Sequence, residues 1–388
     1  DEIASVASAP LRVYAPVGQH HDLLAYLVRR ILENGASSSF LNQLTDQKID
    51  IETVISDPFM ADQTLAMAPV CGTDLFAPVR KNSRGFDIED DGFVQQFETL
   101  VRQADLPTAP TEADQDDIDT ASISAGKTTW KDRAPADRAD ILNAIADGYE
   151  AASDEIFRLI VHEAGKTIDD AVAELREAVD FCRFYASRAS HLPPTARARG
   201  TVVAISPWNF PLAIFTGQIT AALAAGNAVI AKPAEATPRI AALAISLMHE
   251  AGVPRDALQL LCGDGAVIGH HLITAGQADM VVFTGSIQTA KRIERTIAKS
   301  AKPHAPLIAE TGGINAMIVD SSALLERVVD DVLTSAFRSA GQRCSALRML
   351  YIQEDIALAL IDMICAAAAA LTSGDPARSD TDIGPVID

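Results

Sequence analysis

Residues 200–232 read GTVVAISPWNFPLAIFTGQITAALAAGNAVIAK, a pattern typical of a strand, a helix and a second strand. The strand runs at 202–205 and 228–231 are short and apolar, and 211–225 is long enough for a buried helix. The same alternation continues with strands at 258–261, 280–283 and 307–308 and helices at 238–251, 266–274 and 289–300. Strands that alternate with helices predict βαβ units, and therefore an α/β fold with a doubly wound parallel sheet covered on both faces.

Further elements are predicted on both sides of this core. Helical periodicity fills 137–188, and a second αβ run predicts a helix at 324–337, a strand at 349–352 and a helix at 356–371. Residues 45–119 favour a connector, and 106–119 is its most linker-like part because of its prolines and acidic residues.

The N-terminal residues form a separate pattern. A short strand at 12–17 precedes a helical apolar stripe at 23–32, which Gly35 closes. One strand and one helix cannot bury their own faces, so we expect the rest of this unit to lie outside the sequence.

The composition is that of a globular protein with an acidic surface. Hydrophobic residues make up 48% of the 388 residues, enough for a large core. Lys and Arg number 32 against 52 Asp and Glu, and the net charge of −20 excludes nucleic-acid binding through charge. No signal peptide or membrane-spanning stretch is visible. Five scattered cysteines without a CxxC pair argue against disulfides or a zinc site and favour a reducing, cytoplasmic compartment.

Two glycine-containing turns lie where a strand passes into a helix. Residues 263–269 (GDGAVIG) approximate a dinucleotide-binding fingerprint whose last spacing is one residue too long, and tight strand–helix packing is the alternative. Residues 283–286 (FTGS) can present backbone N–H groups to a pyrophosphate, and a plain N-cap serine is the alternative. Neither turn alone identifies a cofactor site.

Three residues have the chemistry of a covalent catalytic site. Cys344 follows Gly341 and Arg343, a setting that favours the thiolate, whereas an inert cysteine is the alternative that fits Cys71, Cys182, Cys262 and Cys365. Glu310 follows an apolar strand, so partial desolvation is expected to raise its pKa toward that of a general base. The Asn209 amide at a strand end can hold an oxyanion. A loop carboxylate and a turn asparagine are the alternatives for these two residues.

Five motifs follow one another in a fixed order: SPWNFP (206–211), KPAEATP (232–238), FTGS (283–286), ETGG (310–313) and GQRC (341–344). Together they resemble the signatures of the aldehyde dehydrogenase superfamily. The longer strings PWNFPLAIFTGQI, LIAETGGINAMIVDSSAL and SAGQRCSALR resemble the L-glutamate γ-semialdehyde dehydrogenases within it.

The resemblance implies a role for each matched residue. Cys344 would be the nucleophile, Asn209 and the Cys344 N–H would hold the oxyanion, and Glu310 would activate water. Ser345 would contact the substrate. NAD would be the cofactor, bound by Ser206, Pro207, Trp208, Lys232, Glu235, Gly265, Phe283, Thr284, Gly285 and Ser286. Lys232 and Glu235 match the positions that bind the ribose, where a carboxylate disfavours a 2′-phosphate.

The N-terminal strand and helix resemble the end of a proline dehydrogenase (β/α)₈ barrel, which uses FAD. Arg29 and Arg30 match a pair that holds the proline carboxylate, Glu33 would orient Arg29, and Tyr14 matches a substrate-side tyrosine. A solvated helix face is the alternative for the arginine pair. Both activities occur together in bifunctional proline utilisation A enzymes, so we expect this sequence to be an internal slice of such a protein.

These resemblances imply four parts: a barrel end at 1–44, a connector at 45–119, an NAD-binding domain at 120–308, and the start of a catalytic domain at 309–388. The implied substrates are L-proline, pyrroline-5-carboxylate and glutamate γ-semialdehyde. They also imply a homo-oligomer and leave open a peripheral membrane contact. The alternatives are another aldehyde dehydrogenase, which would lack the barrel end, and a catalytically silent protein of the same fold, which would lack Cys344, Glu310 or Asn209.

Overall fold

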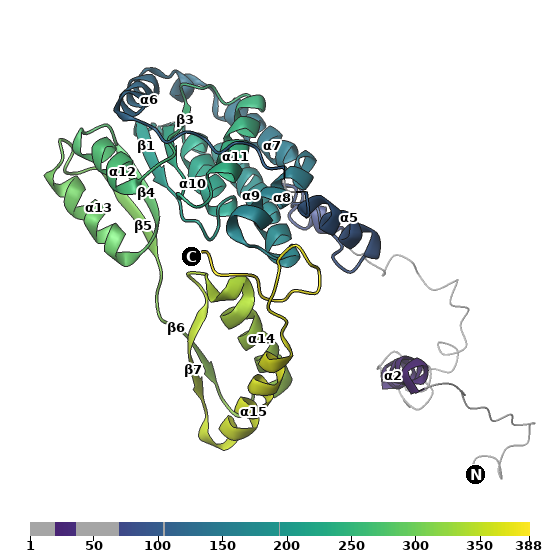
Figure 1. Cartoon of the computed structure of the whole chain (residues 1–388). Helices are drawn as coiled ribbons and strands as arrows, with labels where there is room; N and C mark the ends of the chain where they lie inside the picture. Colours follow the sequence, from purple (N-terminus) through teal and green to yellow (C-terminus); the bar gives the residue numbers. More distant parts are fainter. Residues whose placement is uncertain (1–19, 36–69, 104, 194) are drawn as a thin grey trace, which may run out of the picture. The chain divides into compact units, whose positions relative to one another are not determined.

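The computed structural model describes residues 20–35, 70–103, 105–193 and 195–388, in two units, Asp1–Pro69 and Val70–Asp388 (Figure 1). In the first unit, helix α2 (His20–Gly35) confirms the helix predicted from the stripe at 23–32. The strand predicted at 12–17, which includes Tyr14, lies outside the described residues. The second unit holds the α/β core, and the two units are described separately.

The core of the second unit is a five-stranded parallel sheet. Its strands are β1 (Thr201–Ile205), β2 (Ala228–Lys232), β3 (Leu258–Leu260), β4 (Met280–Gly285) and β5 (Leu307–Thr311), in the order β3-β2-β1-β4-β5. The chain builds outward from β1 to β3 and then returns to add β4 and β5 on the other side of β1. This order confirms the doubly wound α/β fold, and its switch point lies between β1 and β4.

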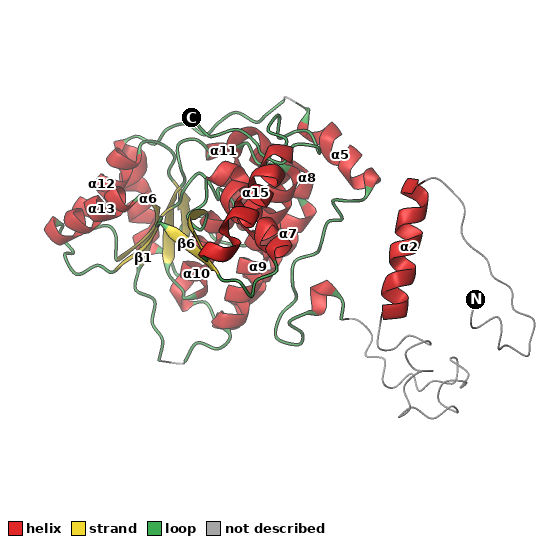
Figure 2. Cartoon of the chain, turned by 90° about the horizontal axis from the view of Figure 1, so that it is seen from below, coloured by secondary structure: helices red, strands yellow, loops and turns green. Residues whose placement is uncertain are grey.

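Helices cover both faces of the sheet, as predicted. Alternate strand residues such as Val202 and Val229 pack on one face against α7 (Pro135–Ala151), α8 (Ser153–Ala164), α9 (Ile168–Ala189), α10 (Ala213–Ala224) and α11 (Pro238–Glu250). Residues such as Val203 and Ile230 pack on the other face with α12 (Gly265–Thr274) and α13 (Ile287–Lys299). Figure 2 shows the strands between these two groups of helices.

The predicted connector contains helix α5 (Asp91–Val101) and the start of helix α6 (Gln115–Lys127). Phe97 and Val101 of α5 are buried in the core, and Ile118 of α6 packs against the sheet. The acidic residues from Asp114 onward begin a helix rather than a linker, because Asp114 and Asp117 form a capping box. Helix α6 therefore crosses the domain boundary expected at residues 119 and 120.

A second, two-stranded sheet follows β5. It pairs β6 (Asn315–Val319) with β7 (Leu347–Ile352) in parallel, and it packs against α14 (Leu325–Phe337) and α15 (Glu354–Ala370). The sequence predicted β7 and both helices, but not β6. The short turn η3 (Arg338–Gly341) joins α14 to the segment that carries Cys344. Among the helices of the described residues, none combines the length and apolar character needed to cross a bilayer.

Candidate active site

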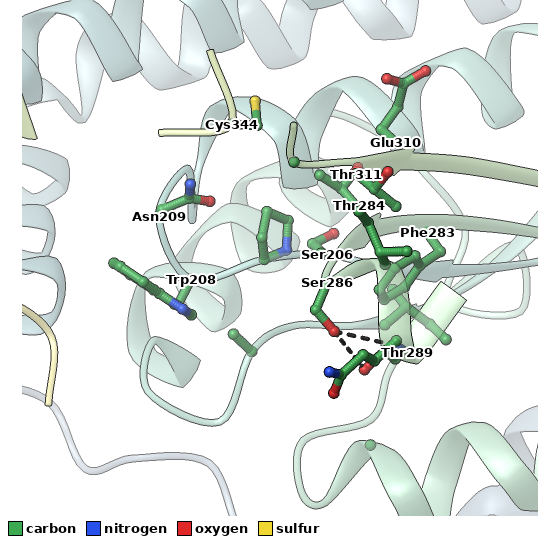
Figure 3. Close-up of a pocket in the computed structure, with 18 of the residues that line it drawn as sticks. Ser206, Trp208, Asn209, Phe283, Thr284, Ser286, Thr289, Glu310, Thr311 and Cys344 are labelled. Carbon is green, nitrogen blue, oxygen red and sulfur yellow. Dashed lines mark hydrogen bonds between the residues drawn. The ribbon is translucent and has the colours of Figure 1, made fainter. Parts of the chain in front are cut away.

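One large cavity lies at the carboxyl ends of β1, β2, β4 and β5, the edge where ligands bind in open α/β sheets (Figure 3). Its volume is about 1650 Å³. The predicted residues that line it are Ser206, Pro207, Trp208, Asn209, Lys232, Glu235, Gly265, Phe283, Thr284, Gly285, Ser286, Glu310 and Cys344. Thus motifs that are separated by up to 138 positions in the sequence, from Ser206 to Cys344, meet in one site.

An ion pair lies on the nucleotide side of the cavity. Lys232 Nζ lies 2.5 Å from Glu235 Oε1, which also accepts a hydrogen bond of 2.8 Å from the backbone N–H of Gly265. Burial raises the pKa of Glu235, but the hydrogen bond from Lys232 and the backbone hydrogen bonds outweigh burial and lower it below its ordinary value. The Glu235 carboxylate therefore stays charged at the wall of the cavity.

The turn at residues 263–269 supports both interpretations of its glycines. Gly263 has a φ of +133°, and a Cβ there would lie 3.1 Å from Ile268 Cδ1, so this glycine serves strand–helix packing. A Cβ at Gly269 would lie 3.5 Å from Ile205 Cδ1, an ordinary contact, so packing does not require a glycine there. Gly265, by contrast, opens α12 and lines the cavity beside Lys232 and Glu235.

Ser286 is the N-cap of α13, as its alternative interpretation stated. Its Oγ accepts a hydrogen bond of 3.2 Å from the backbone N–H of Thr289, drawn in Figure 3. Ser286 and the two residues that follow it also line the cavity, so the first turn of α13 borders this space. A helix N-terminus in that place attracts an anionic group such as a phosphate.

A buried amide joins two of the strand ends beneath the cavity. Gln218 on α10 accepts a hydrogen bond of 2.7 Å from Ser206 Oγ and donates one of 2.9 Å to Thr284 Oγ1. Ser206 follows β1, and Thr284 belongs to β4, so Gln218 bridges the switch point of the sheet. Gln218 lies within the string PWNFPLAIFTGQI, but no role was predicted for it, because the string does not show which strand ends its amide joins.

The segment before Cys344 has an unusual backbone. Ser339, Ala340 and Gly341 follow one another with φ values of +54°, +53° and +67°. The left-handed region costs about 1–2 kcal/mol for a residue with a Cβ, so the first two residues store strain. This turn leads to Gln342 and then to Cys344, which is exposed at the cavity wall.

Asn209 lies beside this segment, in the turn between β1 and α10. Its Nδ2 donates a hydrogen bond of 2.7 Å to the carbonyl of Gln342, two residues before Cys344. In the view of Figure 3, Cys344 lies between Asn209 and Glu310. The structure thus brings the amide to the nucleophile segment, while its role toward an oxyanion stays a prediction.

A buried carboxylate anchors the Asn209 turn from helix α9. Glu174 Oε2 accepts hydrogen bonds from the backbone N–H groups of Leu212 (3.3 Å) and Ala213 (2.8 Å), at the start of α10. Lys166 Nζ lies 3.6 Å from Glu174 Oε1. Burial raises the pKa of Glu174 to about 7, although Lys166 opposes the rise. Sequence reasoning missed both residues, since neither belongs to a recognised motif.

The environment of Glu310 differs from the expected one. We expected partial desolvation of this carboxylate, but Glu310 is exposed in β5, whose last four residues all face solvent. The two glycines that follow it, Gly312 and Gly313, bring no side chain to cover it. Glu310 lines the cavity and meets water directly.

The other cysteines differ from Cys344. Burial raises the pKa of Cys182 strongly and that of Cys262 to about 11, so both thiols stay protonated. Cys71 and Cys365 are exposed, and neither lines the cavity. Cys344 is therefore the one cysteine of the described residues at this site. Ser345 is also exposed, but it is not part of the cavity lining, so its substrate contact stays a prediction.

The predicted proline site belongs to the first unit. Arg29 and Arg30 lie on α2 with exposed side chains. Tyr14 and the side chain of Glu33 lie outside the described residues. The proposed roles of these four residues therefore stay predictions.

Two family models match the chain. Residues 102–388 match the aldehyde dehydrogenase family, and residues 2–43 match proline dehydrogenase. The bifunctional protein PutA of Escherichia coli (strain K12) is 44% identical over 98% of this chain. The alignment covers 32% of that relative, so the chain spans about a third of its length.

Two solved structures are similar to the chain. A crystal structure of a bifunctional proline utilization A (PutA) protein is 48% identical with a TM-score of 0.87, and the match covers 100% of this chain and 42% of the other. A 1-pyrroline-5-carboxylate dehydrogenase from Thermus with bound NAD is 28% identical with a TM-score of 0.73, over 79% of this chain and 70% of the other.

Proposed function

The chain belongs to the aldehyde dehydrogenase family, and on that premise we propose that its cavity oxidises L-glutamate γ-semialdehyde to L-glutamate with NAD. The observation that carries the proposal is that Cys344, Asn209 and the nucleotide turns all line one cavity. The similarity to a 1-pyrroline-5-carboxylate dehydrogenase supports this substrate over other aldehydes, because that compound hydrolyses to the semialdehyde.

The residues of the cavity fit NAD. A volume of about 1650 Å³ exceeds the usual range of small-ligand pockets, roughly 300–1,000 Å³, and leaves room for a dinucleotide. The N-terminus of α13 at Ser286 offers backbone N–H groups to a pyrophosphate, and Gly265 leaves the wall open beside the Glu235 carboxylate. When bound, NAD accepts the hydride that the substrate carbon releases.

The chemistry of the carbonyl group falls to this chain's own residues. The Cys344 thiolate attacks the aldehyde carbon and forms a thiohemiacetal. The Asn209 amide donates to the oxyanion after it exchanges its bond to the Gln342 carbonyl for one to the substrate. Oxidation leaves a thioester on Cys344. Glu310, which already meets water, removes a proton from the water molecule that hydrolyses this thioester and releases glutamate.

In the complete polypeptide we propose that this reaction follows FAD-dependent oxidation of L-proline to pyrroline-5-carboxylate. The match of residues 2–43 to proline dehydrogenase supports this, with Arg29 and Arg30 as carboxylate ligands. The four-part division is proposed with it, but the boundaries expected at 119 and 308 are moved out of α6 and β5, which cross them. We also propose a cytoplasmic homo-oligomer that acts on small molecules and does not bind nucleic acid through this acidic chain.

The test measures NADH formation from glutamate γ-semialdehyde by the complete polypeptide that carries this sequence. Cys344→Ala should lower the rate by about 10³-fold or more, because the covalent step is lost, while the affinity for NAD stays within about twofold. Cys365→Ala, at an exposed cysteine outside the cavity, is the matched control and should keep full activity. Substantial turnover by Cys344→Ala, or equal turnover of unbranched aliphatic aldehydes by the unaltered protein, would contradict the proposal.

A further inference from the structure

We propose that Asp170, near the start of helix α9, is a positioning residue that holds the Cys344 segment against the nucleotide-binding part of the fold. This inference rests on the proposed function, because it concerns the reach of the nucleophile. Asp170 belongs to none of the five motifs and does not line the cavity. It acts through the residues that precede Cys344.

Both oxygens of Asp170 are bound by the turn that leads to Cys344. Oδ1 accepts a hydrogen bond of 3.0 Å from Arg338 Nε, and Oδ2 accepts one of 2.7 Å from Ser339 Oγ. The Asp170 side chain is only 7% exposed, so the ion pair with Arg338 is little screened by solvent. These contacts join residues that are about 170 positions apart in the sequence.

The turn that Asp170 holds would not keep its shape alone. Ser339 and Ala340 have positive φ values, and such strain persists only where the surroundings hold the backbone in place. Asp170 holds the first residue of this run, while Arg348 Nη2 donates to the Gly341 carbonyl at the last (2.6 Å). The strained turn is therefore bound at both ends.

The other purpose of an acidic residue in this place would be to stabilise its own helix. Asp169 and Asp170 both lie in the first turn of α9, where negative charge favours a helix. Asp169 is exposed, and its nearest oxygen lies 3.9 Å from Arg338 Nη2, beyond hydrogen-bonding distance. Asp170, by contrast, directs both oxygens at another segment. The neighbouring aspartate is therefore a matched control for the loss of one charge from the same turn.

The turn sets where the thiol lies relative to the Asn209 amide. Gln342 follows the turn, and its carbonyl accepts the hydrogen bond from Asn209. A turn that relaxes would move Gln342 and Cys344 together, away from the amide. A misplacement of about 1 Å that originates away from the reacting atoms can lower a rate by about 10²-fold.

The experiment measures the rate of NADH formation in the first turnover with glutamate γ-semialdehyde, in the complete polypeptide. Asp170→Ala should lower this rate at least about tenfold and leave the dissociation constant of NAD within about twofold. Asp170→Asn keeps an acceptor for Arg338, so its rate should stay within about threefold of the unaltered protein. Asp169→Asn should match the unaltered protein.

A double-mutant cycle tests whether Asp170 acts through Ser339. If it does, Asp170→Ala should lower the rate less in a Ser339→Ala background than in the unaltered one, because contacting residues couple. Additive effects, a rate for Asp170→Ala within about twofold of the unaltered protein, or an equal loss of NAD affinity would overturn the inference.

A readout without substrate separates this inference from the proposed function. The rate at which iodoacetamide alkylates Cys344, followed by peptide mass, should differ at least about threefold between Asp170→Ala and the unaltered protein. Asp169→Asn should leave this rate unchanged. An unaltered protein that forms no NADH would contradict the proposed function, and equal alkylation rates in that protein and Asp170→Ala would overturn the positioning role.

Discussion

The two sides of the cavity are held in different ways. On the nucleotide side, Ser286 caps Thr289 and Lys232 pairs with Glu235, so each contact joins residues three positions apart. On the nucleophile side, Asp170 holds Ser339 across 169 positions. These two contacts of the nucleotide side can form as its own turns fold, whereas the nucleophile side forms only when α9 and the η3 segment have come together. Damage to long-range contacts should therefore affect catalysis more than damage to local ones.

The largest expected difference in kcat/KM is between two glycine substitutions, one on each side of the cavity. Gly341 has a φ of +67°, and a Cβ there would lie 2.8 Å from the backbone oxygen of Ala336. A Cβ at Gly285 would instead meet the far end of the Phe283 ring at 2.6 Å, which is a side chain rather than backbone. We expect Gly341→Ala to lower kcat/KM by about 10²-fold and Gly285→Ala to lower kcat/KM only a few-fold. Steady-state kinetics checks both, and equal losses would remove the distinction between the two sides.

Glu174 should make the anchoring of the Asn209 turn depend on pH. Burial raises the pKa of Glu174 from 4.5 to about 7, so the folded protein binds this proton more tightly than the unfolded chain does. The stabilisation is complete below about pH 4.5 and is lost as the pH rises through about 7. The difference corresponds to at most about 3 kcal/mol.

Urea unfolding at pH 5 and pH 8 measures this effect. Glu174→Gln cannot titrate, so its free energy of unfolding should change less between the two pH values than that of the unaltered protein. Asp169→Asn, an exposed change in the same helix, should keep the full pH dependence. If Glu174→Gln loses as much stability as the unaltered protein over this range, another group is responsible.

The smallest expected effect concerns the nucleotide side. The charged Glu235 carboxylate at the cavity wall would repel the 2′-phosphate of NADP. Glu235→Gln should therefore raise kcat/KM for NADP relative to NAD by about tenfold, or ~1.4 kcal/mol. Comparing the two cofactors at one ionic strength checks this. An unchanged ratio would show that Glu235 orders Gly265 and Lys232 without selecting the cofactor.

The elements that the sequence predicted are those with local signals. The parallel strands β1, β2 and β4 are apolar runs between turns, and the helix between β1 and β2 is an apolar run too long to be a strand. Strand β6 carries the same kind of signal, an apolar run at 316–319 between Gly313 and Asp320, and was missed although it was readable from the sequence. Helix α6 was hidden by its acidic first turn, although the Asp114–Asp117 spacing is a capping signal.

The residues of the site also divide into those that a local sequence signal marks and those that depend on contacts with distant segments. Ser206, Gly265 and Ser286 of the motif turns all line the cavity, because strand ends of a parallel sheet meet at one edge. Asp170 could not be predicted, since its partner Ser339 lies 169 positions along the chain. The bridging role of Gln218 depends on Thr284, which lies 66 positions away. The exposure of Glu310 was also beyond local reasoning, because it depends on which segments cover β5.

Gln218 has a consequence for how the cleft meets its ligand. Its single amide spans the two strand ends at the switch point, so the floor of the crevice cannot spread unless this amide loses a partner. An unsatisfied buried amide costs on the order of 2 kcal/mol, and the pairing of β1 with β4 adds to this, so fewer than about one molecule in thirty would have a spread floor. A dinucleotide therefore meets a preorganised surface, and the conformational entropy lost on binding comes from the groups above the floor.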